Sequence, residues 1–272
     1  MGFLSVTLGG KLKGSGRFTL RHAEVLGVER LSTEYFLARL RLVEKLPEKP
    51  IPTQFIMIWI PRIDYIPMSI AWFNKDEVHV LFSVRGDGTK ALSNHSGFLG
   101  ILGPLGRGLT PEVLGKRCLM IAGGTGIASL IMLASELRKV GSQVDIIWGV
   151  KNSKGIGHVP QYIKSLTESD LTICTEDCSQ GLCGSVIDCF NEIDLSFYDC
   201  VISSGPNLML LKVGERCLNS GIDPYLVAEA KVECGIGICG SCLLGKEGLR
   251  LCVEGPAFKA SEIINFLRGV QY

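Results

Sequence analysis

The sequence lacks the features that mark membrane-spanning, secreted and nucleic-acid-binding chains. No apolar run approaches the roughly 18 residues that a membrane-spanning helix needs, and the longest runs, such as Phe55–Ile60, have the length of a strand. The N-terminus has no basic segment followed by an apolar segment and a small-residue cleavage site. A formal net charge of +1 gives little electrostatic attraction for nucleic acid. We therefore expect a soluble cytoplasmic protein with no membrane span and no nucleic-acid partner.

The sequence is also poor in the residues of common hydrolytic and metal sites. It has four histidines, and no two of them have the spacing of metal ligands. No serine or cysteine lies in a recognisable nucleophile–base motif. Chemistry carried by protein acids, bases or nucleophiles is therefore not what this sequence predicts.

Cysteine, in contrast, is abundant, and four of the 11 cysteines form a specific pattern near the C-terminus. Cys234, Cys239 and Cys242 have the C-x4-C-x2-C spacing of a plant-type [2Fe–2S] ligand loop, and Cys252 supplies a fourth thiolate. The glycines between them can take positive φ and expose N–H groups to the sulfurs. A zinc site fits poorly, because it normally uses two C-x2-C pairs. We predict a [2Fe–2S] cluster on these four cysteines.

The other seven cysteines show no ligand spacing. An odd total without a secretory signal favours reduced thiols over disulfides. We expect small apolar side chains in or beside buried elements at Cys118, Cys174, Cys178, Cys183, Cys189, Cys200 and Cys217.

Hydrophobic patterning predicts a multidomain α/β and β fold. Short strands separated by turn residues, such as Tyr35–Val43 and Val78–Val84, are typical of an antiparallel β-barrel. A buried strand at Cys118–Ala122, a helix at Ile127–Val140 and a strand at Val144–Val150 then form the βαβ unit of a parallel nucleotide-binding sheet. The last fifty residues show little of the hydrophobic periodicity of helices or strands and are rich in glycine and cysteine. The predicted domains are residues 1–112, 113–222 and 223–272.

A glycine turn follows the first strand of the βαβ unit, formed by Gly123, Gly124, Thr125 and Gly126. Glycines allow a phosphate to approach the backbone, and the start of a helix favours an anion. A glycine turn can also serve only to pack strand against helix. The second strand ends in Lys151 and not in the acid of the dinucleotide fingerprint. The residues alone leave both interpretations open.

Taken together in chain order, the motifs resemble a known fold. Pro67–Ser69 and Gly86–Thr89 are weak signals alone, since Asp-Gly is an ordinary turn. Followed by Gly123–Gly126 and Ser204–Pro206, they resemble the ferredoxin reductase fold. The segment Glu233–Phe258 is more specific and closely resembles the electron-transfer subunits of class 1B dihydroorotate dehydrogenases.

The resemblance implies an oxidoreductase subunit of pyrimidine (UMP) biosynthesis. An FMN-containing catalytic subunit oxidises dihydroorotate, and electrons pass through the [2Fe–2S] cluster and FAD to NAD⁺ or another acceptor, in a heterotetramer with two copies of each subunit. The first domain would bind FAD, the second NAD and the third the cluster. By matching positions, the residues implied to contact the flavin are Pro67, Met68, Ser69, Ile70, Leu81, Phe82, Ser83, Gly88 and Thr89.

Two positions depart from the family pattern. Ile66 stands where the family usually has an arginine that pairs with flavin phosphate, so Arg85 is a candidate substitute. Ser204 stands where the family usually has a cysteine beside the nicotinamide. We therefore expect weaker FAD binding, which Ile66→Arg should tighten. We also expect slow or absent reduction of NAD⁺, with efficient reduction of artificial dyes.

Two other functions fit part of the pattern. One is the diaphorase subunit of a hydrogenase or of a ferredoxin:NAD(P)H oxidoreductase complex; several of these lack cysteine at the first ligand position, so Cys234 favours the dihydroorotate assignment. The other is a redox sensor that holds a cluster without flavin. The motifs Pro67–Ser69 and Gly86–Thr89 argue against a sensor.

Overall fold

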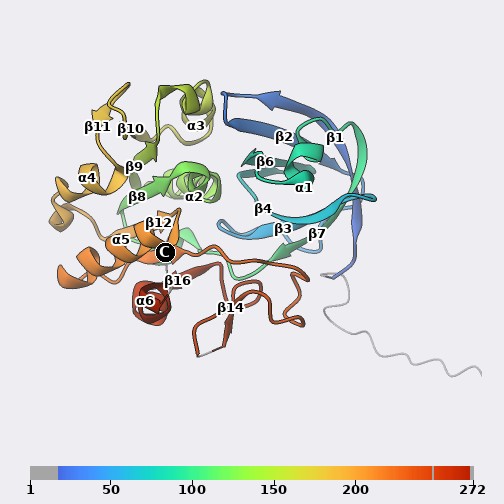
Figure 1. Cartoon of the computed structure of the whole chain (residues 1–272). Coiled ribbons are helices and arrows are strands. Elements are labelled where there is room, and N and C mark those ends of the chain that lie inside the picture. Colours follow the sequence, from blue (N-terminus) through green and yellow to red (C-terminus); the bar gives the residue numbers. More distant parts are fainter. Residues whose placement is uncertain (1–17, 247, 270–272) are drawn as a thin grey trace, which may run out of the picture.

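The computed structural model describes residues 18–246 and 248–269 as two seven-stranded sheets that lie side by side (Figure 1). Residues 1–17 of the first predicted domain, and residues 247 and 270–272 of the third, lie outside the described residues. The predicted domain boundaries remain predictions. No helix in the described part of the chain is long and apolar enough to cross a membrane.

The first sheet is antiparallel and curled, with the strand order β4-β3-β7-β1-β2-β6-β5. Its strands are β1 (Arg21–Arg30), β2 (Tyr35–Leu42), β3 (Phe55–Ile60), β4 (Asp64–Ser69), β5 (Trp72–Asn74), β6 (Glu77–Ser83) and β7 (Gly97–Leu105). A short helix, α1 (Asp87–Leu92), follows β6 and packs on β3 and β4. Within the described residues the end strands β4 and β5 do not pair with each other, so the sheet does not close and the expected barrel is a half-barrel.

The second sheet is parallel except for its last strand, with the order β11-β10-β9-β8-β12-β13-β16. Its strands are β8 (Arg117–Gly123), β9 (Gln143–Val150), β10 (Asp170–Thr175), β11 (Leu182–Cys183), β12 (Cys200–Ser204), β13 (Tyr225–Val227) and β16 (Ala257–Lys259). The helices that cover it are α2 (Ile127–Lys139), α3 (Val159–Thr167), α4 (Val186–Asn191), α5 (Asn207–Asn219) and α6 (Ala260–Gly269). Single 3₁₀ turns lie at Pro111–Val113, Gly124–Gly126, Ser153–Gly155 and Leu195–Phe197.

The elements expected from long apolar patterns are confirmed to within one residue at each end. The run Phe55–Ile60 is β3, and Tyr35–Val43 corresponds to β2. The predicted helix Ile127–Val140 is α2, in which ten of 13 residues are buried. This helix is apolar on nearly every side because it lies between the sheets and contacts strands of both.

The C-terminal segment is tied to both sheets. β13 and β16 pair with each other, and β13 also pairs with β12, so both ends of the segment belong to the second sheet. Between them the chain makes a loop and the small hairpin β14 (Leu243–Leu244) and β15 (Leu249–Arg250). A Cβ on Gly235 would contact Leu105 and Met57, so this loop lies against the first sheet. Figure 1 shows the orange-to-red segment passing beneath both sheets.

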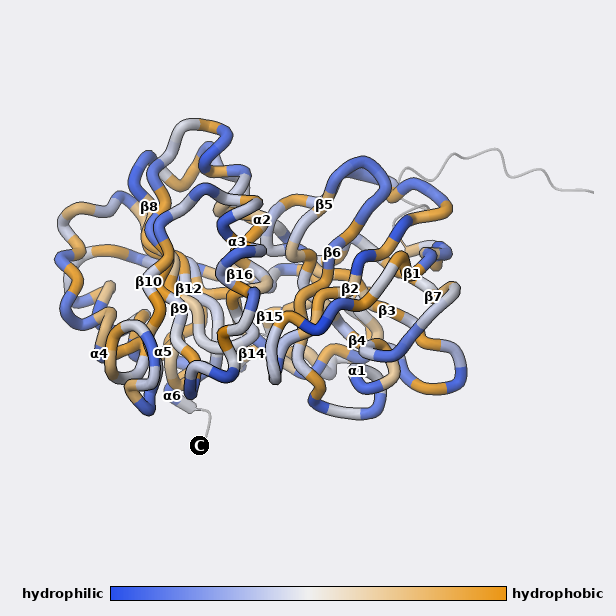
Figure 2. The backbone as a smooth tube through the Cα atoms, turned by 90° about the horizontal axis from the view of Figure 1, so that it is seen from above, coloured by the Kyte–Doolittle hydropathy of each residue, from blue (hydrophilic) through white to orange (hydrophobic). Residues whose placement is uncertain are grey.

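The core runs without interruption from one sheet to the other. One cluster of buried side chains joins α2 to Tyr35, Leu37 and Leu81 of the first sheet. Another joins the helices α4 to α6 to Phe55 and Met57 of the first sheet and to the C-terminal segment. Hydrophobic residues gather along the inner strands of both halves (Figure 2). The sheets are therefore held in a fixed relation, and the pockets between them are built on packed side chains.

Candidate functional site

A cleft of about 790 Å³ opens beside β4, β6 and the start of α1. Eight of the nine residues implied to contact the flavin line it, namely Pro67, Met68, Ser69, Leu81, Phe82, Ser83, Gly88 and Thr89. The ninth, Ile70, does not line the cleft and is buried in the core of the first sheet. The structure thus brings most of the sequence-derived flavin residues to one cavity.

Two of these residues, Gly88 and Thr89, stabilise the turn from β6 into α1. The Thr89 hydroxyl accepts hydrogen bonds from the N–H groups of Arg85 (2.8 Å) and Gly86 (3.1 Å) and donates to the Gly86 carbonyl (3.0 Å). A Cβ on Gly88 would lie 2.5 Å from a carboxylate oxygen of Asp64 and 2.6 Å from the Ile66 side chain. The glycine therefore lets α1 approach β4, and the threonine holds the turn that borders the cleft.

Arg85 supplies a cation in this cleft where Ile66 does not. The Ile66 side chain is buried and faces Gly88. Arg85 is exposed, lines the cleft, and donates from Nε to the Ser83 hydroxyl at 3.0 Å. A guanidinium that is anchored at one nitrogen still has other N–H groups that can donate hydrogen bonds to a phosphate. Arg85 is therefore placed in the cleft as the candidate substitute, and its pairing with phosphate remains a prediction.

Arg85→Ala is expected to weaken FAD binding by about 10- to 100-fold, because a hydrogen bond to a charged group contributes roughly 1.5–3 kcal/mol. Titration of flavin-free protein with FAD, followed by flavin fluorescence, measures the change. Lys90→Ala is the matched control, since Lys90 lies on α1 but does not line the cleft. Adding Ile66→Arg to Arg85→Ala should recover affinity. If Arg85→Ala binds FAD with unchanged affinity, Arg85 does not contribute to the flavin site.

A second pocket, of about 650 Å³, lies at the carboxyl ends of the parallel strands, where nucleotides bind in open α/β sheets. Gly123 and Gly124 line it, together with Lys151 and Lys212. It also contains an acid on a different strand from the one that the sequence analysis considered: Glu176 directly follows β10 and lines the same pocket. The sequence analysis missed Glu176 because it did not identify β10, whose first four residues alternate between exposed and half-buried and include two polar residues.

The structure shows the packing role of the glycine turn, and nucleotide binding there remains a prediction. Gly123 and Gly124 line the second pocket, whereas Thr125 and Gly126 line a third. A Cβ on Gly126 would overlap the Ser204 carbonyl, so the turn also packs closely on the end of β12. Its glycines are needed for packing and border two cavities at once.

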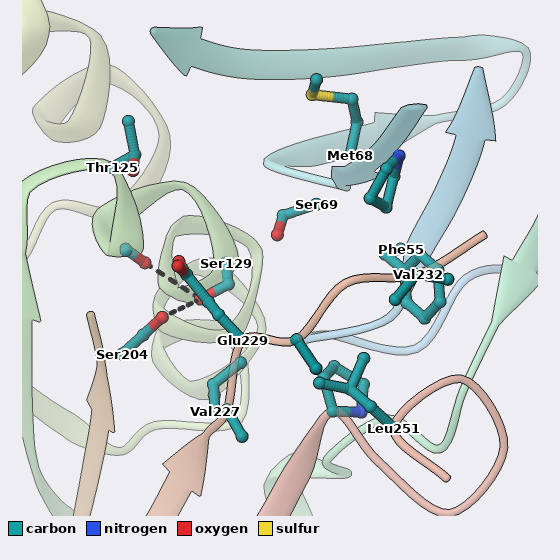
Figure 3. A pocket seen from close by; sticks show the side chains of 15 residues that line it. Phe55, Met68, Ser69, Thr125, Ser129, Ser204, Val227, Glu229, Val232 and Leu251 are labelled. Carbon is teal, nitrogen blue, oxygen red and sulfur yellow. Dashed lines mark hydrogen bonds between the residues drawn. The ribbon is translucent and has the colours of Figure 1, made fainter. Parts of the chain in front are cut away.

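The third pocket, of about 270 Å³, lies where the three parts of the protein meet (Figure 3). The first sheet contributes Pro67–Ser69, and the second contributes Thr125 and Ser204. The C-terminal segment contributes Val232 and Leu251, close in sequence to the cluster cysteines. The Ser204 hydroxyl is buried and lies 2.8 Å from the Ser129 hydroxyl, which is 2.9 Å from the Gly126 carbonyl.

Glu229 is the ionisable residue of this third pocket; the other 14 residues that line it carry no titratable side chain. Its carboxyl group extends toward Ser129 and Ser204, and Ser69 points into the same space (Figure 3). Burial raises the pKa of Glu229, although its side chain is open to the pocket, and the charge of Arg85 opposes this in part. The sequence offered only a weak signal, an acid just after the short apolar run of β13.

The four cysteines of the C-terminal motif come together in two pairs. The sulfurs of Cys242 and Cys252 lie 3.3 Å apart, and those of Cys234 and Cys239 also share a hydrogen bond. Partial burial raises the pKa of Cys234, but N–H groups of Cys239, Ile236 and Ile238 outweigh it and lower the pKa to about 6. Burial and the hydrogen bond shared with Cys242 raise the pKa of Cys252 to about 12.

This arrangement fits a [2Fe–2S] cluster better than a zinc ion. A binuclear cluster takes its cysteines two to each iron, and the structure pairs Cys234 with Cys239 and Cys242 with Cys252. Backbone N–H groups already face the sulfur of Cys234, as an anionic cluster requires.

Two disulfides correct the expectation for the remaining cysteines. They join Cys174 to Cys189 and Cys178 to Cys183. The first pair is buried as expected, but the second is exposed and joins the turn after β10 to Cys183 in β11. The spacing in the sequence did not reveal these disulfides, because the cysteines meet only when the chain folds back from β10 through β11 to α4. Three cysteines are free and buried as expected: Cys118, Cys200 and Cys217.

Comparison with known proteins assigns the family. Residues 229–264 match the family described as the iron-sulfur cluster binding domain of dihydroorotate dehydrogenase B. A relative from Archaeoglobus fulgidus, named for the electron transfer subunit of dihydroorotate dehydrogenase B (NAD(+)), is 32% identical over 252 residues, which cover 89% of this chain and 98% of the relative. The chain belongs to this family of electron transfer subunits. The dihydroorotate dehydrogenase B subunit of Clostridium acetobutylicum is 36% identical over 203 residues, 73% of this chain and 78% of that one.

Solved structures place this electron transfer subunit in the ferredoxin-reductase-like fold. A chain of an NADH-dependent reduced ferredoxin-NADP oxidoreductase superposes with a TM-score of 0.76 at 22% identity, covering 92% of this chain and 94% of that one. The ferredoxin reductase of a carbazole 1,9a-dioxygenase gives a TM-score of 0.63 at 18% identity, with coverages of 75% and 67%. The resemblance read from the sequence is confirmed for both family and fold.

Proposed function

We propose that this electron transfer subunit takes electrons from a dihydroorotate-oxidising catalytic subunit at a [2Fe–2S] cluster and passes them through FAD to NAD⁺ in pyrimidine biosynthesis. The third pocket is the observation that carries the proposal. The flavin motif, the glycine turn and the cluster segment all line this one cavity, through Ser69, Thr125 and Leu251 among others. Carriers placed in these three sites would lie next to one another, as electron transfer requires.

When bound, FAD would convert single electrons from the cluster into a hydride for NAD⁺. The chain's own residues then have distinct tasks. Arg85 is placed to pair with phosphate, and Pro67–Ser69 to position the flavin ring. Glu229 places its carboxyl group inside the third pocket, where burial raises its pKa. Apolar walls such as Phe55 and Val232 limit the entry of water to this space.

The second pocket supports a nicotinamide dinucleotide as the acceptor. Glu176 is placed to accept hydrogen bonds from ribose hydroxyls, and Lys151 and Lys212 to attract phosphates. The glycine turn allows the pyrophosphate to approach the backbone closely. The acid at the end of β10 thus takes the place of the one that the sequence analysis sought at the end of β9.

The contact with the catalytic subunit is proposed to surround the exposed ligand Cys239. Its neighbour Ile238 is 79% exposed, and Leu243 and Val253 are exposed nearby on the same segment. An apolar rim of this kind is covered in complexes by a partner surface. A heterotetramer with two copies of each subunit, located in the cytoplasm, completes the proposal.

Co-purification tests the function. The subunit produced together with its catalytic partner should form a complex that contains FMN, FAD and a [2Fe–2S] cluster and that oxidises dihydroorotate with an added acceptor. A visible spectrum with iron–sulfur absorption but no flavin would instead support the redox sensor. A cluster-containing flavoprotein that gains no dihydroorotate oxidation from any partner would reject the assignment.

The acceptor preference is a separate prediction. We expect the complex to reduce an artificial dye faster than NAD⁺, because Ser204 is smaller and less polarisable than the cysteine usual in the family, and Ser129 engages its hydroxyl. Ser204→Cys should raise the rate with NAD⁺ several-fold and leave the rate with dye unchanged. Steady-state assays with dihydroorotate measure both. Equal turnover with NAD⁺ and dye in the parent complex would contradict this prediction.

A further inference from the structure

An ion pair with unusually complete geometry lies at the cluster loop. In Arg250, at the end of β15, Nη2 lies 2.6 Å from Oε1 of Glu254 and Nε lies 3.3 Å from Oε2. The Arg250 backbone N–H donates to the same carboxylate at 2.7 Å, and the Glu254 N–H donates to the Arg250 carbonyl at 2.9 Å. The two residues therefore flank the ligand Cys252 in one fixed turn.

The same guanidinium also contacts the opposite side of the ligand loop. Nη1 of Arg250 donates to the Gly237 carbonyl at 3.3 Å. Gly237 lies between Cys234 and Cys239, and its own N–H donates to the sulfur of Cys252. A Cβ at Gly237 would lie 2.6 Å from the Val253 side chain and 3.3 Å from Nη1 of Arg250. Arg250 thus joins the segment carrying the fourth ligand to the loop that carries the first two.

We propose that Arg250 and Glu254 are positioning residues that place opposite charges beside the cluster and thereby set its reduction potential. The inference rests on the proposed function, because it requires a bound cluster. A [2Fe–2S] cluster with four thiolates is anionic and gains one more negative charge on reduction. A nearby cation favours the reduced form, whereas a nearby carboxylate favours the oxidised form. Removal of either partner leaves the other charge unbalanced.

The geometry distinguishes this pair from ordinary surface ion pairs. The side chains of Arg250 and Glu254 are 40% and 34% exposed and are held by several hydrogen bonds, including two to the backbone. Lys231 and Glu233, near the same loop, make one contact between side chains that are 80% and 50% exposed. Mobile, solvated charges are screened by water and salt. The electrostatic field of Arg250 and Glu254, which are held in place, would therefore act on the cluster more strongly than that of Lys231 and Glu233.

The test is an EPR-monitored redox titration of the cluster in the full-length holoprotein. Arg250→Gln should move the midpoint potential to a more negative value, and Glu254→Gln should move it to a more positive value. Each shift should correspond to about a tenfold change in the ratio of reduced to oxidised cluster, or about 59 mV for one electron. The double variant should return close to the parent. Arg268→Gln, in the remote pair with Glu215, is the control and should not shift the potential.

The direction of the shifts separates an electrostatic role from a merely structural one. A structural role would lower cluster content or broaden the EPR signal in both single variants without opposite shifts. Arg250→Lys keeps the positive charge but loses the two-nitrogen contact with the Glu254 carboxylate. Its midpoint potential should therefore stay near that of the parent. If Arg250→Gln fails to hold a cluster, Glu254→Gln decides alone, and an unchanged midpoint overturns the inference. Absence of a cluster in the parent protein would instead reject the proposed function.

Discussion

Replacement of Cys239 by serine is expected to remove the [2Fe–2S] cluster and to leave FAD bound. Iron–sulfur clusters need soft thiolate ligands, and a serine hydroxyl keeps its proton at neutral pH. Cys239 is exposed and belongs to no core, so its loss does not act through unfolding. The proposed flavin cleft is built mainly by β4, β6 and α1, far along the chain from this loop. Iron and sulfide analysis, the EPR spectrum of reduced protein and chromatography of released flavin measure both outcomes.

Ser241→Ala is the matched control for this experiment. Ser241 lies between the ligands Cys239 and Cys242, and its hydroxyl donates to Glu233 at 2.6 Å. This variant should keep both cofactors. A normal reduced-state EPR signal from Cys239→Ser would show that the ligand assignment is wrong. Loss of flavin together with the cluster would show that the two sites fold as one unit.

Glu229→Gln is expected to lower the rate of NAD⁺ reduction by about 100-fold or more, within the range that a positioned acid or base contributes. Two electrons and one proton must combine before a hydride can leave for NAD⁺. Glu229 is the titratable group of the pocket between the proposed flavin and cluster sites. Glutamine has the same shape but carries no transferable proton. Direct reduction of ferricyanide, a one-electron acceptor that needs no proton, should change little and serves as the internal control.

The pH dependence gives a second test of Glu229. Burial raises the pKa of Glu229, so the carboxyl group holds its proton to a higher pH than an exposed glutamate does. As proton donor, it should support NAD⁺ reduction at low pH and lose this ability as the pH rises through its pKa. Glu229→Gln should remove this dependence, and Glu229→Asp should keep it at a reduced rate. A pH profile of Glu229→Gln that matches the parent would exclude the carboxyl group as the donor.

The features that were predictable from the sequence depend on local pattern. Phe55–Ile60 is continuously apolar and forms β3, and the C-x4-C spacing brings Cys234 and Cys239 together. Glu176 and Glu229 were not predictable, because each is placed by a short strand whose pairing depends on the whole sheet. Thr89 shows a different limit: the motif identified the residue, but its hydroxyl holds the turn into α1.

The pairing of β13 with β16 gives the subunit a modular construction. Val227 and Ala257 lie opposite each other in adjacent antiparallel strands, and the Ala228 N–H donates to the Pro256 carbonyl at 2.9 Å. The residues between β13 and β16, which include all four cluster cysteines, therefore leave the second sheet after β13 and rejoin it beside β13 at β16. A tight turn joining these two strands would close the sheet without these residues. The iron–sulfur segment is in this sense an insertion between two paired strands of the second sheet.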